Sequence, residues 1–373
     1  MKVCGIAAEY NPFHYGHMHH IEEARKESGC DVIAAVMSGN FVQRGEPAVI
    51  DKWTRSRCAV AGGADLVLEL PCLYASQNAA AFARGAVDIL KDIGADAMAF
   101  GSECGNLENL LDIASTPADP DRLRELMSDG MSYPRAYSIL TSSMYPNDIL
   151  AVAYLKELAG SSIRPVVIPR IGDYSSTDTD AEYASAAAVR RALKEKQDIF
   201  PLTPMAKELL TQPCVTMEDL YPYFRTLILT LPRSYVSSLF LVSEGIEKTL
   251  KDAAMTAETL DAFLKQAVSY RYTAARIRRI MIQIMMHVTA AEARQFDRHH
   301  TVRVLAFNER GREYLHEKKK DGSCTFAVRF AALPEKMRQM EYQAALLYTS
   351  QMREADRQAL LKKEISGAQY VCR

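Results

Sequence analysis

Residues 2–26 read KVCGIAAEYNPFHYGHMHHIEEARK and contain the clearest structural pattern in the chain. The apolar run from Lys2 to Ala8 predicts a buried strand, and the one-sided charges from His17 to Lys26 predict an amphipathic helix. The loop between them contains two histidines and a glycine. Open α/β sheets hold their ligands in the loops that follow the carboxyl ends of their strands. This loop is therefore the first place to expect a binding site.

The same order of strand, loop and helix recurs through the first half of the chain. Short apolar runs bounded by glycine and proline, such as DLVLEL at 65–70, are typical of strands buried on both faces of a parallel sheet. We therefore predict an α/β fold with a Rossmann-like, doubly wound parallel sheet. The predicted strands are 2–8, 31–37, 65–70, 97–100 and 164–170, and the predicted helices are 17–26, 52–61, 77–90 and 185–194.

The second half of the chain has a different pattern. The proline-containing segment 201–213 ends the alternation, and helical periodicity dominates from Ser237 onward. We predict two domains, an α/β domain over 1–200 and a mainly α-helical domain over 201–373. The helices expected in the second domain are 244–253, 257–267, 273–287, 312–320 and 335–354, with one strand-like run at 301–307.

Composition excludes several classes of protein. Apolar residues make up 48% of the 373 residues and charged residues 24%, which is the balance of a globular protein. The eight cysteines include no C-x-x-C pair, which argues against a disulfide framework or a zinc knuckle. An acidic residue at position 9 comes too early for a signal peptide, and no window of about eighteen residues is uninterruptedly apolar. We therefore expect a cytoplasmic protein without a membrane segment.

The histidines of the first loop suit phosphate chemistry. His14 and His17 are three residues apart at the predicted start of a helix, so both rings can point the same way. Their N–H groups, beside a helix N-terminus, can stabilise charge that develops on phosphate oxygens, and Gly16 lets a nucleotide approach closely. The alternatives are a helix cap or core packing, or a metal site completed by His19 and His20. We favour the phosphate role and predict no metal site.

Longer motifs point to one family. The motif N-P-F-H-x-G-H at 11–17 resembles the HxGH signature of nucleotidyltransferases related to class I aminoacyl-tRNA synthetases, which transfer AMP from ATP. The segments SGNFVQRGEPA at 38–48 and GADLVLELP at 63–71 resemble, more narrowly, the bacterial tRNA(Met) cytidine acetate ligases. The resemblance continues through FGSE at 100–103, PNDIL at 146–150, IPR at 168–170 and RYT at 271–273, and covers nearly the whole chain.

This resemblance implies an ATP site made by the first loop and three later residues. Gly101 would leave room for the nucleoside, Asn147 would read the purine or ribose, and Arg170 would bind phosphate as a planar fork. Alternatively, Gly101 only permits a turn, Asn147 only caps a helix and Arg170 is a solvated strand end. Asp148 is an alternative to Asn147 as the residue that contacts the nucleotide. The implied ATP-binding residues are Ala7, Ala8, Glu9, Tyr10, Asn11, Pro12, Phe13, His14, Tyr15, Gly16, His17, Met18, His19, His20, Gly101, Asn147 and Arg170, of which His14 and His17 would be catalytic.

Two further elements bear on the same site. Ser185 and Arg190 match the Ser-x-x-x-(Ile/Val)-Arg element with which the superfamily holds the departing pyrophosphate at a helix N-terminus. The alternative is an N-cap serine that opens an alanine-rich helix with an exposed arginine. After Arg170 the family often has a Tyr-His pair, whereas this chain has Asp-Tyr-Ser at 173–175. No histidine is therefore assigned a role there.

Six cationic residues are assigned to RNA binding. Three of them surround the glycines that follow the second predicted strand, and the alternative is a charged loop and helix face. The other three lie between Lys265 and Ala290, a stretch without acidic residues in which Tyr270 and Tyr272 are interleaved with arginines. Cations dominate affinity for an RNA backbone and aromatic rings can stack on bases, although such a stretch can also be a solvated helix face. The assigned residues are Arg44, Lys52, Arg55, Arg271, Arg276 and Arg279.

The resemblance implies a two-step ligase. Acetate and ATP would form acetyl-AMP, and the acetyl group would pass to N4 of the wobble cytidine of elongator tRNA(Met), giving N4-acetylcytidine. Mg²⁺ is expected to accompany ATP, and the resemblance also suggests a homodimer. One alternative is a small-molecule adenylyltransferase that condenses nicotinamide mononucleotide with ATP. The other is a non-catalytic RNA-binding protein that has kept the fold.

Overall fold

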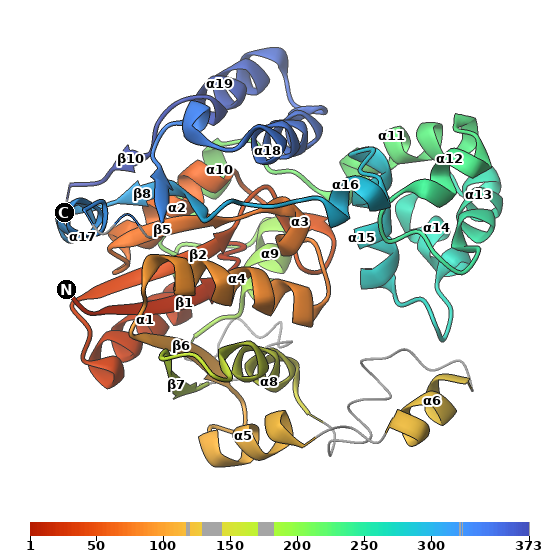
Figure 1. Cartoon of the computed structure of the whole chain (residues 1–373). Coiled ribbons are helices and arrows are strands. Elements are labelled where there is room, and N and C mark those ends of the chain that lie inside the picture. The colour runs from red at the N-terminus through yellow and green to blue at the C-terminus, as the bar shows by residue number, and fades with distance from the viewer. Residues whose placement is uncertain (117–119, 129–143, 171–182, 321, 323, 373) are drawn as a thin grey trace.

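The computed structural model describes residues 1–116, 120–128, 144–170, 183–320, 322 and 324–372 (Figure 1). Residues 173–175, where the family's Tyr-His pair would stand, lie outside this part of the chain. None of the helices in the described residues is long and apolar enough to cross a membrane.

A parallel sheet forms the centre of the molecule. The parallel strands lie in the order β5-β2-β1-β6-β7, so the sheet grows from β1 in both directions. This reversal beside β1 is the topological switch point of a doubly wound sheet, and it confirms the predicted fold class. The strands are β1 (Val3–Ala8), β2 (Val32–Ser38), β5 (Leu66–Leu70), β6 (Ala97–Ser102) and β7 (Arg164–Pro169).

Both faces of this sheet are buried by helices. On β2 the side chains alternate, because Ile33 and Ala35 pack into one core and Val32 and Ala34 into the other. One face is covered by α1 (Tyr15–Ser28), α2 (Lys52–Ala61), α9 (Ala186–Lys194) and α10 (Ala206–Thr211). The other is covered by α4 (Ala79–Ile93), α8 (Pro146–Leu158) and α17 (Glu309–Lys318). Shorter helices α3 (Cys72–Ala75), α5 (Leu107–Ser115) and α6 (Pro120–Ser128) lie in the connections.

A helical lobe with its own core follows α10 and stands to one side of the sheet (Figure 1). Its helices are α11 (Met217–Thr230), α12 (Arg233–Ser238), α13 (Ile246–Thr256), α14 (Leu260–Ala267), α15 (Ala274–Met285) and α16 (Ala290–Arg294). Sequence patterning predicted no helix over 217–230, where Pro222 interrupts the run. The helix forms because Thr216 and Asp219 make a capping box and Leu220 and Phe224 are buried in the lobe core.

The chain then returns to the sheet. β8 (Thr301–Phe307) pairs antiparallel with β5, and β9 (Thr325–Ala327) and β10 (Gln369–Tyr370) pair with β8. The 3₁₀ turn η1 (Phe330–Ala332) and helices α18 (Glu335–Thr349) and α19 (Glu354–Glu364) lie between these last strands. Residues 201–373 thus supply the helical lobe and, through β8 and β10, strands that extend the sheet of the first half.

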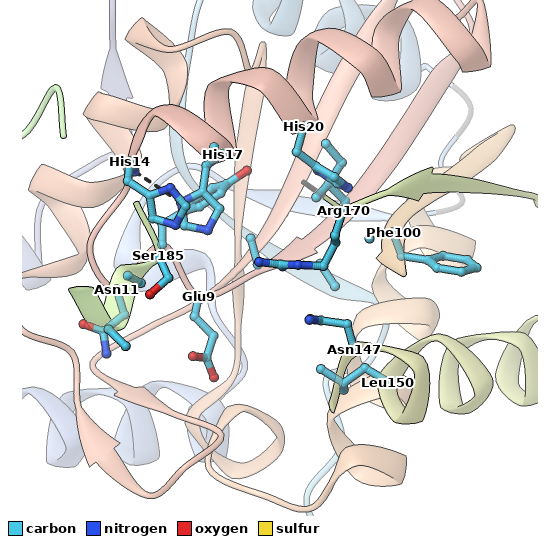
Figure 2. A pocket seen from close by; sticks show the side chains of 18 of the residues that line it. Glu9, Asn11, His14, His17, His20, Phe100, Asn147, Leu150, Arg170 and Ser185 are labelled. Carbon is cyan, nitrogen blue, oxygen red and sulfur yellow. Dashed lines mark hydrogen bonds between the residues drawn. The ribbon is translucent and has the colours of Figure 1, made fainter. Parts of the chain in front are cut away.

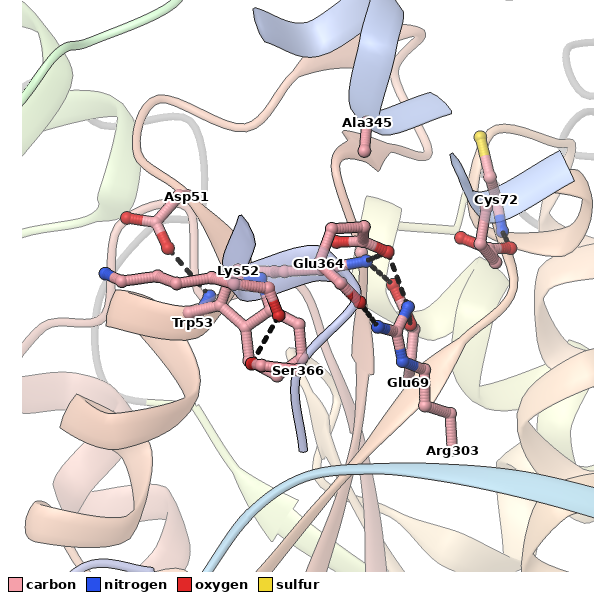
Figure 3. A network of polar contacts seen from close by, with 12 residues as sticks. Asp51, Lys52, Trp53, Glu69, Cys72, Arg303, Ala345, Glu364 and Ser366 are labelled. Atoms are coloured by element: carbon pink, nitrogen blue, oxygen red, sulfur yellow. Dashed lines mark hydrogen bonds and ion pairs between the residues drawn. The ribbon is translucent and has the colours of Figure 1, made fainter. Parts of the chain in front are cut away.

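A buried cluster of four charges fastens this returning segment (Figure 3). Lys52 Nζ contacts Glu69 Oε1 at 2.6 Å and Glu364 Oε1 at 2.9 Å. Arg303 Nη1 contacts Glu69 Oε2 at 3.0 Å and Glu364 Oε1 at 2.6 Å. The four side chains are at most 2% exposed, so each charge depends on its partners for compensation. The cluster joins α2, β5, β8 and α19.

Replacing Lys52 by Met should strongly destabilise the protein. The variant keeps the volume of the side chain but leaves two buried carboxylates facing one arginine, which costs about 3–5 kcal/mol. Urea unfolding followed by circular dichroism measures this loss of unfolding free energy. Lys194→Met, at an exposed position of α9, is the matched control and should leave the curve nearly unchanged. Equal stability of the two variants would contradict a clamping role for the cluster.

Candidate active site

A cavity opens at the carboxyl edge of the sheet, around the ends of β1, β6 and β7 (Figure 2). The N-termini of α1, α8 and α9 also line it, and each of these helices directs the positive end of its dipole towards the cavity. Such helix ends favour a negatively charged ligand such as a phosphate group. The cavity therefore combines the position expected from the switch point of the sheet with a favourable electrostatic field for a nucleotide.

The two histidines of the predicted motif stand side by side at the start of α1. The ring centroids of His14 and His17 are 3.7 Å apart, and His14 is the N-cap residue of the helix. Tyr10 meets the His17 ring edge-on at 4.9 Å, and Phe13 stacks on it at 5.7 Å. A side chain on Gly16 would come within 3.0 Å of the His14 ring. Gly16 is therefore needed for the packing of this ring.

Both rings are held in their neutral form. Burial, with Arg170 and Arg190 close by, lowers the pKa of His14 to about 3. Burial, followed by the neighbouring His14 and His20, lowers the pKa of His17 well below its ordinary value. The backbone N–H of His14 donates to Nδ1 of His17 at 3.2 Å, so the proton of the neutral His17 ring is on Nε2. His17 thus offers one N–H donor and is a poor proton acceptor.

Hydrogen bonds from distant segments fix the backbone of the loop. Arg190 Nη1 donates to the carbonyl of Asn11 at 2.6 Å, and the Thr203 hydroxyl donates to the carbonyl of Phe13 at 2.5 Å. The side-chain oxygen of Asn11 accepts from the backbone N–H of Val49 at 2.7 Å. Asn11 and Arg190, both predicted to bind ATP, therefore also hold the loop in shape, while both line the cavity.

The opposite end of the cavity can receive a nucleoside. Gly101 lies at the end of β6, and a side chain there would come within 3.2 Å of the Arg170 side chain. Asn147 lines the cavity, and its Nδ2 donates to Glu103 Oε1 at 2.6 Å. Asp148 instead is buried and accepts from the Ser102 hydroxyl at 2.5 Å and from the backbone N–H of Glu103 at 3.1 Å. Asn147 rather than Asp148 is thus positioned to contact a ligand.

The other predicted residues near the motif have identifiable packing roles. The Ser185 hydroxyl accepts from the backbone N–H of Ala188 at 3.1 Å, so it caps α9 as well as lining the cavity. His19 stacks on Tyr183 with centroids 5.2 Å apart. Burial and the nearby Arg170 lower the pKa of His20 to about 4. Within the described ranges, no three His, Cys, Asp or Glu side chains are grouped to hold a metal ion.

A hairpin that lines the cavity packs against the helical lobe. A short hairpin of β3 (Phe41–Val42) and β4 (Glu46–Pro47) carries Arg44 to the cavity wall. Gly45, at φ +75°, lies so close to α15 that a side chain would come within 2.4 Å of the Arg279 backbone nitrogen. Arg279 Nη1 donates to the carbonyl of Gln43 at 3.1 Å. The hairpin and the arginine-rich start of α15 therefore form one side of the molecule beside the cavity.

Two of the six residues assigned to RNA binding are buried. The Arg55 side chain donates to the backbone carbonyls of Glu9 at 2.6 Å and Ser38 at 3.0 Å, and also to that of Gly39. Lys52 belongs to the charge cluster described above. Both side chains are 0% exposed, so the prediction that they contact RNA is wrong. Arg44 and Arg271 are exposed, while Arg276 and Arg279 are partly buried.

Comparison with known proteins identifies the family. A model described as HIGH Nucleotidyl Transferase matches residues 1–363. The chain belongs to this family. A tRNA(Met) cytidine acetate ligase from Limosilactobacillus reuteri is 35% identical over 93% of this chain and 95% of the relative, and one from Streptococcus gordonii is 39% identical over 86% and 88%. Crystal structures of Thermotoga maritima TmcAL, without ligand and with alpha-thio ATP, align over 100% of both chains with TM-scores of 0.90 and 0.88 at 28% and 27% identity.

Membership of the HIGH nucleotidyl transferase family confirms the expected family and the expected class of enzyme, an ATP-dependent ligase. The roles of individual site residues stay predictions, and the structure shows which of these residues line the cavity. Sequence reasoning gave no role to several lining residues, and it gave Glu9 no role apart from the rest of its loop. Position at the end of a parallel strand was the available signal for Ile168, which lies at the end of β7. The missed lining residues include Gln43, Leu150, Tyr154, Ile168 and Tyr183.

The neighbours Asn147 and Asp148 should respond differently to substitution. Asn147→Ala should weaken ATP binding about fivefold, as expected for the loss of about 1 kcal/mol from one hydrogen bond, and should change stability little. Asp148→Ala should leave the buried donors of 102–104 unsatisfied and lower the unfolding free energy by about 1–3 kcal/mol. Isothermal titration calorimetry with ATP and thermal unfolding measure the two effects. The reverse pattern would assign the ligand contact to Asp148.

Proposed function

We propose that this enzyme activates acetate with ATP and transfers the acetyl group to N4 of the wobble cytidine of elongator tRNA(Met). Relatives that match 86–93% of this chain carry the name tRNA(Met) cytidine acetate ligase, and a structural neighbour binds an ATP analogue. The product would be N4-acetylcytidine. In the first step an acetate oxygen attacks the α-phosphorus of ATP, and the bond from phosphorus to the pyrophosphate oxygen breaks.

The residues at the start of α1 suit this first step. Negative charge grows on the non-bridging α-phosphate oxygens, and the Nε2 proton of His17 and the end of the α1 dipole can stabilise it. The neutral imidazole of His14 contacts the His17 ring and lies close enough to contact the same phosphate group. The N-terminus of α9, with Ser185 and Arg190, can receive the departing pyrophosphate.

The single observation that carries the tRNA assignment is the contact of the hairpin with α15. It joins the nucleotide cavity to a surface that contains Arg44, Arg271 and Arg276, with Arg276 stacked on Tyr272 at 4.1 Å. Glu244 lies 3.7 Å from Arg271 and 3.8 Å from Arg276, so three arginines outnumber one carboxylate on this surface. An arginine-rich surface beside an open cavity suits an RNA that must insert one base. A small-molecule adenylyltransferase does not need an arginine-rich surface beside its active site. A non-catalytic RNA-binding protein does not need two neutral histidines in a nucleotide cavity.

Three expectations accompany this proposal. Mg²⁺ would be held mainly through triphosphate oxygens and water, because the described part of the chain groups no three metal-binding side chains. A tRNA substrate places the enzyme in the cytoplasm. The homodimer suggested by the family resemblance stays a prediction, which sedimentation velocity measures.

Radiolabelled acetate tests the function directly. With ATP and bulk bacterial tRNA, the protein should place label in tRNA, and the His14→Ala, His17→Ala double variant should lower the rate by at least about 10²-fold. Nuclease digestion and chromatography should find the label in N4-acetylcytidine. Pyrophosphate release with nicotinamide mononucleotide and no labelled tRNA would favour the adenylyltransferase. RNA binding without any ATP consumption would favour the non-catalytic alternative.

The arginines of the lobe should affect tRNA and not the nucleotide. Arg271→Glu with Arg276→Glu should raise the KM for tRNA at least about tenfold and flatten its dependence on salt, because cationic contacts to phosphates are lost. Acetate-dependent ATP–pyrophosphate exchange should change little. Arg310→Glu, at an exposed position of α17, reverses the same charge elsewhere and serves as the control. Parallel losses in exchange and in tRNA use would contradict this division of labour.

A further inference from the structure

The second step of the proposed reaction needs a proton acceptor. The exocyclic amine of cytidine is a weak nucleophile, because its lone pair is delocalised into the ring. When N4 attacks the acetyl carbonyl it must lose a proton, and a positioned general base accelerates such a step by about 10²–10⁴-fold. The two histidines do not suit this task, because burial lowers the pKa of both.

Glu9 directs a carboxylate into the cavity at the point where β1 ends. In Figure 2 it lies between the histidine pair and Asn147. One oxygen, Oε1, accepts from the backbone N–H of Gln43 at 2.8 Å, which anchors the side chain to the hairpin. The backbone carbonyl of Glu9 accepts from Arg55 at 2.6 Å. Both ends of the residue are therefore held in place.

The surroundings of Glu9 make it a stronger base than an ordinary carboxylate. Burial raises its pKa, and this effect outweighs the opposing effects of the Gln43 N–H and of the nearby Arg190 and Arg44. Glu46, which also lines the cavity among the described residues, is instead paired with Arg278 at 3.1 Å. Glu9 is thus the lining carboxylate that is available for proton transfer.

The position of Glu9 also fits the direction from which an RNA base would arrive. Gln43 donates its N–H to the Glu9 carboxylate, and its carbonyl accepts from Arg279 of α15. One peptide residue therefore connects the carboxylate to the arginine-rich helix. The Glu9 carboxylate therefore lies beside both the histidine pair that lines the cavity and the hairpin that contacts the lobe.

We propose that Glu9 accepts the proton from N4 of cytidine as this nitrogen attacks acetyl-AMP, an inference that rests on the proposed function. A bond forms between N4 and the acetyl carbon, and the bond between that carbon and the phosphate oxygen of AMP breaks with its electron pair. One proton moves from N4 to a carboxylate oxygen of Glu9. The products are N4-acetylcytidine and AMP, and the proton leaves Glu9 to water in the next cycle.

Transfer from supplied acetyl-AMP isolates the second step from the first. Single-turnover acetylation of elongator tRNA(Met) should be slower in Glu9→Gln than in the unmodified protein by about 10²–10⁴-fold. Glu22→Gln, an exposed glutamate of α1, removes the same charge and should change the rate less than threefold. Acetate-dependent ATP–pyrophosphate exchange, which reports the first step alone, should change little in Glu9→Gln.

The pH profile provides a readout that a purely structural role would not move. In the unmodified protein the transfer rate should rise with pH until Glu9 is deprotonated and then level off, with the midpoint above the ordinary carboxylate range because burial raises the pKa. Glu9→Gln should lack this rise. A variant rate within threefold of normal, or a parallel loss of ATP–pyrophosphate exchange, would overturn the role of Glu9. No transfer by the unmodified protein would instead overturn the proposed function.

Discussion

The buried guanidinium of Arg55 is the interaction on which the rest of the site depends. It donates to carbonyls at the end of β1, at the end of β2 and at Ile50, so one side chain holds three chain segments together. An arginine has five N–H donors in a rigid plane, which suits such a task. The end of β1 carries Glu9 and leads into the histidine loop. The end of β2 leads into the hairpin. The relative placement of these groups therefore follows from one buried cation.

The same helix extends this control to the rest of the molecule. Lys52, one turn before Arg55 on α2, joins the charge cluster that attaches β8 and α19 to the sheet. The hairpin in turn rests on α15 through Gly45 and Gln43. The sheet, the returning segment and the helical lobe are thus connected through α2 and its neighbours. A cavity at the junction of these parts can serve a nucleotide and a macromolecule at once.

Local patterns in the sequence predicted the parts of the fold that depend on neighbours. The apolar run at 31–37 and the short spacing between His14 and His17 are local, and the predicted strand and the predicted proximity of the two rings agree with the structure. Local patterns could not predict that Lys52 is buried, because its partner Glu364 is 312 residues away in the sequence and a lone lysine is usually exposed. The choice between Asn147 and Asp148 likewise depends on the turn after β6. Sequence reasoning therefore identified the histidine loop and the family. It did not distinguish the buried cations, such as Lys52 and Arg55, from the exposed ones, such as Arg44 and Arg271.

The antiparallel strand β8 has a consequence for how the protein is made. The parallel strands and the nucleotide loop are synthesised before residue 200, but their partner at the β5 edge comes from 301–307. Until the ribosome has added the whole helical lobe, β5 is an open edge, and Glu69 lacks the arginine that compensates its charge. Unpaired edges are the sites at which nascent chains associate wrongly. During synthesis, residues 1–200 should therefore depend on a chaperone to remain soluble until β8 is available to pair with β5.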